Sequence, residues 1–198
     1  VSRLPAIAVS GSNIHVVWYD FRDGNPEIYH KCSTDGGRTW SPDLRLTNSG
    51  ANSFRPSVAV SGSNVHLVWE EGFSGGYDIY YKRSTDGGIT WEPSTLLSND
   101  PANSLSSSIA ISDSAIHVVW MDNRNGTDNY EIYYKRSTDE GVTWGPETRL
   151  TNDPAWSGPT SIAVSGSNIH VAWSESRDGN AEVYYKHSID GGANWGPD

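Results

Sequence analysis

The chain has 198 residues, of which 35% are hydrophobic, and its formal net charge is −10 at neutral pH. This negative charge argues against binding of nucleic acid or of an anionic membrane surface, because both need clustered cations. No stretch is long and apolar enough to be inserted across a bilayer, and the single cysteine, Cys32, excludes an internal disulfide. Nine Trp, ten Tyr and twenty Gly residues indicate short, aromatic-anchored strands with frequent turns.

Each quarter of the chain shows the same order of four short strands. In the first copy, residues 6–9, 14–18, 27–31 and 44–47 are β-branched, aromatic or small, and turn-forming residues separate them. We therefore predict an all-β fold, a β-propeller built from four-stranded antiparallel blades. We expect residues 1–198 to form a single propeller with repeats at about 1–52, 53–104, 105–157 and 158–198. The last repeat is incomplete because the sequence stops before its outer strand.

The pattern Ser-x-Asp-x-Gly-x-Thr-Trp occurs between the third and fourth strands of the repeat. It spans residues 33–40, 84–91, 137–144 and 188–195, and Asn194 replaces the threonine in the last copy. Its aspartates are Asp35, Asp86, Asp139 and Asp190, so the successive steps are 51, 53 and 51 residues. A period in this range is typical of propeller blades.

This pattern is similar to the Asp-box, or BNR repeat, of sialidases and sialidase-like β-propellers, and its four copies cover essentially the whole chain. The resemblance implies a turn on the outer rim of each blade. We expect the aspartate to accept N–H groups of its own turn, the second glycine to adopt a conformation closed to other residues, and the tryptophan to pin the turn to the sheet. These structural residues are Ser33, Asp35, Gly37, Trp40, Ser84, Asp86, Gly88, Trp91, Ser137, Asp139, Gly141, Trp144, Ser188, Asp190, Gly192 and Trp195.

The resemblance also raises the question of catalysis. Sialidases hold the substrate carboxylate with three arginines, and the first lies in a Phe/Tyr-Arg-Ile-Pro motif. Arg3, in Ser-Arg-Leu-Pro, and Arg55, in Phe-Arg-Pro, are the candidate counterparts at the start of an innermost strand. Glycoside hydrolysis needs unlike groups at one centre, whereas the acids that follow the second-strand tryptophans recur once per blade. This repetition favours a scaffold over an enzyme. The recurring acids are Asp20, Glu71, Asp122 and Glu175.

Two columns of the repeat invite a metal hypothesis. Asp20, Asp23 and Glu27 surround a glycine turn, and oxygen side chains so spaced suit calcium. The neighbouring Arg22 favours the alternative, a solvated hairpin with carboxylate–arginine pairs, and no other cofactor is expected. One histidine per blade lies beside the second-strand tryptophan, and for these we expect buried hydrogen bonds rather than metal ligation. The column consists of His15, His66, His117 and His170.

Aromatic residues outside the repeated columns are the candidates for ligand contact. Loops on a rigid scaffold often carry binding residues, and exposed rings among polar neighbours suit sugar stacking. The alternative is that these rings pack against an adjacent blade. The candidates are Tyr19, Phe73, Tyr77, Tyr130 and Trp156.

From these features we expect a non-catalytic Asp-box propeller that serves as a glycan- or protein-binding or structural module of a secreted or cell-surface protein. The alternative is a sialidase-like glycoside hydrolase, exo-acting on sialylated glycans, or a fragment of one. The unpaired edge of an incomplete last blade is a pairing site. We therefore expect an arc of a longer propeller or a homo-oligomer that completes the ring through this edge, with a self-contained four-bladed ring as the remaining alternative.

Overall fold

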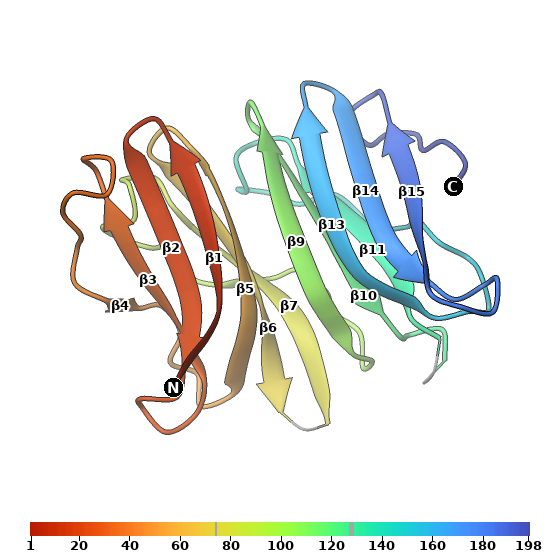
Figure 1. Ribbon diagram of the computed structural model, residues 1–198, viewed down its shortest axis with the longest axis horizontal. Helices are drawn as coiled ribbons and strands as arrows, with labels where there is room; N and C mark the ends of the chain where they lie inside the picture. Colours follow the sequence, from red (N-terminus) through yellow and green to blue (C-terminus); the bar gives the residue numbers. More distant parts are fainter. Residues whose placement is uncertain (74, 127–128) are drawn as a thin grey trace. The chain divides into compact units, whose positions relative to one another are not determined.

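The computed structural model describes residues 1–73, 75–126 and 129–198 (Figure 1). These residues form strands, turns and loops, and within them no helix is long and apolar enough to cross a membrane. The strands make four antiparallel sheets, of which three have four strands and the last has three. The prediction of an all-β propeller with a last blade that lacks its outer strand is confirmed.

The strands of each sheet follow one another in sequence order. Sheet 1 contains β1 (Ser2–Ser10), β2 (Asn13–Asp20), β3 (Glu27–Ser33) and β4 (Leu44–Arg45). Sheet 2 contains β5 (Asn52–Ser61), β6 (Asn64–Phe73), β7 (Gly76–Ser84) and β8 (Thr95–Leu96). Sheet 3 contains β9 (Ser104–Ser112), β10 (Ala115–Asp122), β11 (Glu131–Ser137) and β12 (Thr148–Arg149). Sheet 4 contains β13 (Ser157–Ser165), β14 (Asn168–Glu175) and β15 (Glu182–Ser188).

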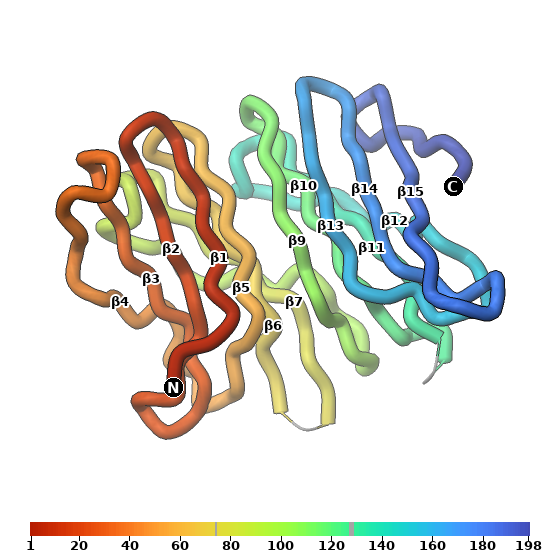
Figure 2. Tube along the Cα trace, in the orientation of Figure 1, coloured from red at the N-terminus to blue at the C-terminus, as the bar shows by residue number. Residues whose placement is uncertain are grey.

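The chain divides into two compact units, each made of two sheets. Unit 1 comprises Val1–Ser98 and unit 2 comprises Asn99–Asp198. Within unit 1 the first strands of the two sheets, β1 and β5, lie side by side, and β9 and β13 do the same within unit 2 (Figure 2). Each unit therefore contains one complete contact between consecutive blades.

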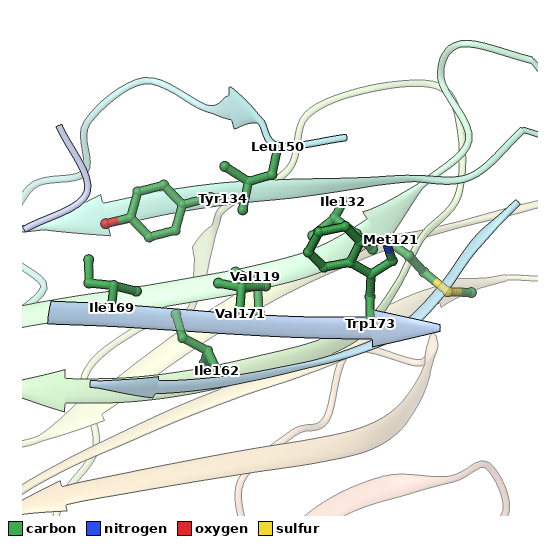
Figure 3. Packing of buried hydrophobic residues seen from close by; sticks show 9 residues of the cluster. All are labelled: Val119, Met121, Ile132, Tyr134, Leu150, Ile162, Ile169, Val171 and Trp173. Atoms are coloured by element: carbon green, nitrogen blue, oxygen red, sulfur yellow. The ribbon is translucent and has the colours of Figure 1, made fainter. Parts of the chain in front are cut away.

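The sheets of each unit pack face to face through aliphatic side chains and a second-strand tryptophan. In unit 2, Val119 and Ile132 of sheet 3 pack in one cluster with Val171 and Trp173 of sheet 4 (Figure 3). In unit 1, the corresponding cluster includes Val17 and Ile28 of sheet 1 and Leu67 and Trp69 of sheet 2. Full burial of one such side chain contributes about 1.5–3 kcal/mol, so this layer is the main stabilising contact inside each unit.

The first strand of each sheet is longer than predicted because it continues through a bulge. The register of β1 against β2 shifts between Arg3 and Ala6, and that of β5 against β6 shifts between Phe54 and Ser57. At equivalent positions, Leu4 and Arg55 have positive φ angles of 46° and 45°. Such a conformation costs about 1–3 kcal/mol for a residue with a side chain. The bulge thus places Arg3 and Arg55 inside strands, where the sequence predicted only the start of one.

Candidate functional site

Each Asp-box is a turn closed by its own serine and aspartate. In the first box, the Asp35 carboxylate accepts hydrogen bonds from the Ser33 hydroxyl (2.8 Å), the Thr39 N–H (2.9 Å) and the Thr39 hydroxyl (2.6 Å). The Ser33 oxygen in turn accepts the Gly37 N–H at 2.9 Å. In the last box the amide of Asn194 donates to Asp190 at 2.7 Å, so it replaces the threonine hydroxyl.

These donors determine the chemistry of the box aspartates. Hydrogen bonds from the Thr39 side chain and N–H and from the Ser33 hydroxyl lower the pKa of Asp35 to about 2. Equivalent donors lower the pKa values of Asp86, Asp139 and Asp190 to about 2 as well. A carboxylate that is ionised and fully engaged in its own turn is a structural element rather than a proton donor.

The box tryptophans of sheets 2 and 4 contact the preceding sheet of their unit. The Trp91 ring meets the His30 ring edge-on at a centroid distance of 5.3 Å, and Trp195 meets Tyr134 at 4.9 Å. The corresponding Trp40 of sheet 1 is 40% exposed. The tryptophan therefore joins two sheets, whereas the sequence predicted only that it pins its own turn.

The histidine column makes side-chain hydrogen bonds to the third strand of the same sheet. His66 and His117 bond Tyr81 and Tyr134 at 2.7 Å through Nδ1. His170 and His15 make the equivalent bonds to the Tyr185 hydroxyl (2.6 Å) and to His30 Nε2 (3.1 Å). Burial lowers the pKa values of His30, His66 and His117 to about 4, so these imidazoles are neutral at pH 7.

The three calcium candidates of the first hairpin pair with arginines. Ser2 and Arg22 both donate to Asp20, and the Arg22 hydrogen bond holds the pKa of this carboxyl well below its usual value. Arg45 pairs with Asp23 at 3.2 Å and with Glu27 at 2.7 Å. Over the described ranges, no group of three His, Cys, Asp or Glu side chains is arranged to hold a metal ion. Calcium binding at this hairpin stays a prediction.

The five aromatic candidates occupy different environments. Tyr19 was expected in a loop, but it lies in β2 and is 7% exposed because it packs in the core of unit 1. Phe73 ends β6 and is 64% exposed, and Tyr77 is half-buried in β7. In unit 2, Tyr130 packs against the core and Trp156 is 37% exposed. The Ser157 N–H donates to the Tyr130 carbonyl, so these two aromatic segments are adjacent.

One end of unit 1 brings several of these rings together with Arg3, one of the two candidate arginines; Arg55 follows Phe54 in β5. Tyr19 meets Phe21 at 5.8 Å and Phe54 at 5.1 Å, and Phe54 meets Tyr77 at 6.0 Å. The Arg3 guanidinium lies 5.9 Å from the centre of the Phe21 ring. We call this group the basic-aromatic cluster; its residues are Arg3, Tyr19, Phe21, Phe54, Arg55, Glu70 and Tyr77.

The cluster contains an ion pair that sequence reasoning missed. The Glu70 carboxylate, 1% exposed, accepts a hydrogen bond from Arg55 Nη1 at 3.0 Å, while the Arg55 side chain is 52% exposed. The pair fixes the guanidinium end of the Arg55 side chain on a buried carboxylate, while about half of the side chain stays exposed. Arg55 also has the positive φ angle of the bulge, so its backbone is constrained as well.

Glu70 stands out only when the columns of the repeat are compared for differences. The residue directly after the second-strand tryptophan differs among the four sheets: it is Tyr19, Glu70, Met121 and Ser174. The residue at the repeat position of Arg3 also differs: in the other three sheets it is Phe54, Leu105 and Gly158. At both positions the residues of unit 2 differ in chemical type from those of unit 1. At the repeat position of Tyr77, in contrast, unit 2 also has a tyrosine, Tyr130. The site was missed from the sequence because only the columns that all blades share were compared.

Comparison with a family model finds that residues 8–154 match the BNR repeat-like domain. No curated protein sequence matches the chain.

Solved structures with the same fold are enzymes that act on carbohydrates. An α-L-arabinofuranosidase from Fusarium graminearum, in complex with an iminosugar inhibitor, is 15% identical with a TM-score of 0.72, over 96% of this chain and 63% of that one. An α-L-arabinanase from Penicillium chrysogenum, complexed with arabinobiose, is 14% identical with a TM-score of 0.71, over 98% and 66%. A Trypanosoma rangeli sialidase with the inhibitor DANA is 15% identical with a TM-score of 0.67, over 98% and 37%. The chain therefore spans less than two thirds of the length of these enzymes.

Proposed function

The chain belongs to the family of BNR repeat-like domains, and from this premise we propose that it is a non-catalytic glycan-binding domain whose site is the basic-aromatic cluster of unit 1. The observation that carries the proposal is a chain of four ring contacts that ends at Arg3. Beside it, the Arg55–Glu70 ion pair lies next to Phe54, whose register partner is Glu70. Repetition explains blade structure, but it does not explain this group, because within the described residues unit 2 has Leu105 and Gly158 where the group has Arg3 and Phe54.

The composition of the cluster suits a sugar. Aromatic faces pack against the C–H faces of pyranose and furanose rings, and a few polar groups at fixed positions orient the ligand. The rings of Phe54 and Tyr77 are half-buried, which restrains them, and Arg3 and Arg55 supply donors for hydroxyl or carboxylate oxygens. The solved structures with the same fold include complexes with arabinobiose and with an iminosugar, which supports a carbohydrate as the ligand class.

Two of the acids in or beside the cluster, Asp20 and Glu70, are already engaged by donors of the chain, which favours binding over hydrolysis. A glycosidase needs a carboxylic acid that gives up a proton at the working pH, together with a second carboxylate or equivalent nucleophile. Asp20 is held ionised by Arg22 and Ser2, and Glu70 is paired with Arg55. Both carboxylates are therefore already engaged with donors of the chain itself.

The sialidase-like hydrolase remains the second candidate, and Arg3 is the observation that favours it. Arg3 precedes Leu4 and Pro5 on the innermost strand and is exposed beside Phe21, where an arginine of the Arg-Ile-Pro motif is expected. The ligand is a carbohydrate in both cases, and turnover of the bound sugar separates the two functions. A secreted or cell-surface location fits either function and is part of the proposal.

A glycan array followed by a hydrolysis assay tests the proposal. We expect the wild-type domain to bind a defined set of glycans, and Arg3→Ala to weaken that binding at least tenfold. The matched control, Arg38→Ala, changes another exposed arginine in the first box turn and should bind as the wild type does. No binding on the array would overturn the glycan proposal, and turnover of fluorogenic glycosides that is lost in Arg3→Ala would replace it with the hydrolase.

A further inference from the structure

In sheets 1, 3 and 4, an arginine covers the recurring acid that follows the second-strand tryptophan. It lies two residues after the acid in the sequence, and its guanidinium group pairs with the carboxylate. The guanidinium also lies over the ring of a third-strand tyrosine, 4.4, 4.2 and 4.1 Å from the ring centre. Each arginine therefore gains a charge-assisted hydrogen bond and a cation–π contact. The groups are Asp20 with Arg22 and Tyr29, Asp122 with Arg124 and Tyr133, and Glu175 with Arg177 and Tyr184.

Sheet 2 has the acid and the tyrosine of this arrangement without the arginine. Its acid is Glu71 and its tyrosine is Tyr80, and Phe73 stands at the repeat position of the arginine. The Phe73 side chain is 64% exposed, so it does not cover the acid as the arginines do. In the part of the chain that the structure describes, Glu71 makes no ion pair and Tyr80 has no cation over its ring. Sheet 2 thus carries the two groups that receive a guanidinium in the other sheets.

The equivalent glutamate of sheet 4 shows how such a carboxylate binds an arginine. The Trp173 Nε1–H donates to Glu175 Oε2 at 2.6 Å. Arg177 donates from Nε to Oε1 of Glu175 at 2.6 Å and from Nη2 to Oε2 at 2.8 Å, which is a two-pronged contact. In sheet 2 the Trp69 Nε1–H donates to Glu71 Oε2 at 2.9 Å, and among the described residues no donor reaches Oε1. Glu71 is therefore oriented as Glu175 is, with one oxygen available.

Both groups of sheet 2 are accessible to a ligand. Glu71 is half-buried, whereas the three acids that lie beneath an arginine are at most 3% exposed. Tyr80 is half-buried and packs against the core of unit 1, and Tyr184 packs against the core of unit 2 in the same way. Because the Tyr184 ring still receives Arg177 at 4.1 Å, this packing leaves room for a guanidinium.

Lys82 does not take the place of the arginine. Its Nζ donates to the Leu46 carbonyl of the neighbouring sheet at 2.8 Å, and Lys186 makes the equivalent bond at 2.6 Å in sheet 4, where Arg177 is present as well. Over the described ranges, no ion pair joins Lys82 to Glu71. Burial lowers the pKa of Lys82, and the Glu71 carboxylate opposes this shift through space. The lysine therefore has its own structural contact and leaves the free oxygen of Glu71 available.

We propose that Glu71 and Tyr80 form a binding site for the guanidinium group of an arginine side chain that a partner protein supplies. The arginines of the other sheets identify the ligand, because the same two groups take a guanidinium there. A guanidinium is planar, donates two parallel hydrogen bonds to a carboxylate and stacks on an aromatic ring, whereas a lysine ammonium is a point charge. Ser94 stands where the other sheets place a second acid on the arginine, so the site has one carboxylate.

A whole arginine residue suits the site better than a free guanidino compound. In sheets 1 and 3 the backbone N–H of the arginine also donates to the acid, from Arg22 to Asp20 at 2.8 Å and from Arg124 to Asp122 at 2.9 Å. An arginine within a polypeptide carries such an N–H. Neither Glu71 nor Tyr80 belongs to the basic-aromatic cluster, so the site does not depend on the glycan proposal.

An NMR titration with N-acetyl-arginine amide tests the site, because the Trp69 indole N–H bonds Glu71 and so reports on this carboxylate. We expect the probe to shift the Trp69 Nε1–H signal, and N-acetyl-lysine amide to bind about threefold more weakly. Glu71→Gln removes the charge and should weaken binding about tenfold. The control Glu140→Gln, at an exposed position on a box turn, should bind as the wild type does. No shift of the Trp69 signal, or equal binding by the wild type and Glu71→Gln, would overturn the proposal.

Phe73→Arg supplies an arginine from sheet 2 itself and so tests the comparison with the other sheets. This side chain should occupy Glu71 and Tyr80, so the probe should no longer bind and the free energy of unfolding should rise. Phe73→Leu keeps an uncharged apolar side chain and should bind the probe as the wild type does. Unchanged binding of the probe to Phe73→Arg would refute the equivalence of sheet 2 with the other sheets, on which the proposal rests.

Methylguanidine distinguishes the two sources of a guanidinium. It lacks the aliphatic stem and the backbone N–H of arginine, so it should bind more weakly than N-acetyl-arginine amide, in the same titration of the Trp69 signal. Equal or tighter binding of methylguanidine would assign the site to a free guanidino compound, and the partner protein would be the wrong source.

Discussion

The indole ring of Trp91 lies edge-on against the imidazole ring of His30 on the neighbouring sheet, with the ring centres 5.3 Å apart and an interplanar angle of 72°. Trp195 and Tyr134 repeat the arrangement in unit 2 at 4.9 Å and 74°. The box tryptophan is thus an inter-sheet anchor, and the Asp-box serves to present it. Because the tryptophan is part of the Asp-box turn, a substitution that disrupts the turn should also weaken the packing between the two sheets.

The second box glycine should be more sensitive to substitution than the first. A Cβ atom on Gly88 would lie 2.5 Å from His30 Cε1, and the residue has a φ angle of 83°. Gly87 also has a positive φ angle, 75°, but a Cβ atom there would meet nothing within 4 Å. We expect Gly88→Ala to reduce the free energy of unfolding by about 3 kcal/mol and Gly87→Ala by about 1 kcal/mol, measured by chemical denaturation.

The difference in unfolding free energy between Gly88→Ala and Gly87→Ala measures how much the packing of the Asp-box on the neighbouring sheet contributes to stability. Glu140 already occupies the position of Gly87 in the third box with a φ angle of 58°, which shows that a side chain fits there. Equal losses in the two variants would mean that backbone conformation alone sets the cost and that the close approach of Gly88 to His30 adds nothing.

The arginine that follows the second strand should hold the blade hairpin together. Arg124 donates to the buried Asp122 carboxylate, bonds Glu147, and lies 4.2 Å from the centre of the Tyr133 ring. Arg124→Met leaves the Asp122 charge buried without its main partner and should cost about 3 kcal/mol of unfolding free energy. The exposed Arg38→Met is the control, with an expected change near zero; a loss in Arg124→Met no larger than in the control would refute this role.

The buried imidazoles should make the fold sensitive to mild acid. His30, His66 and His117 have pKa values of about 4 in the folded chain against 6.5 when unfolded, because burial opposes their charging. The unfolded chain therefore binds more protons between pH 6.5 and 4, and stability falls as the pH is lowered through this window. The free energy of unfolding is measured by denaturation at several pH values and plotted against pH. His117→Gln should reduce the slope of this plot by at most about 1.4 kcal/mol per pH unit. An unchanged slope would mean that His117 is already charged in the folded state.

A second loss of stability is expected at lower pH from the box aspartates. The pKa of Asp86 is lowered to about 2 from 3.8 by its Thr90, Ser84 and Ile89 donors. Its contribution is fully present above pH 3.8 and is lost as the pH falls towards 2. Asp86→Asn should lower the melting temperature at pH 7. It should also make the melting temperature depend less on pH below about pH 4. Asp113→Asn, an exposed aspartate in another turn, should follow the wild-type curve.

Local sequence was enough to predict the sheets and the turns. Strand patterns and the donors and acceptors of the Asp-box lie within a few residues of one another, as in the Ser33–Asp35–Thr39 network, so their geometry follows from the repeat itself. The bulge at Arg3 and Arg55 was missed because the following prolines suggested the start of a strand. The contact of Trp91 with His30 was missed because it depends on how two sheets pack.

The candidate site was harder to predict because it depends on departures from the repeat. Glu70 and Arg55 are ordinary residues in sequence, and they become notable only when the fold places them 3.0 Å apart at one end of unit 1. Tyr19 was assigned to a loop, yet the second strand extends past its tryptophan and buries it. The similarity of the blades argues against a dedicated site, and the departures from the repeat in unit 1 are the basis of the site that we propose.

The most direct test of glycan binding by unit 1 is an NMR titration of the isotope-labelled domain with the glycan that binds best on the array. We predict that the largest shifts fall on the basic-aromatic cluster and that its signals saturate together. Unit 2 residues at the same repeat positions, such as Leu105, Ser106 and Asn123, should stay unchanged. Shifts that are confined to unit 2, or that occur equally at all four sheets, would contradict binding at this cluster.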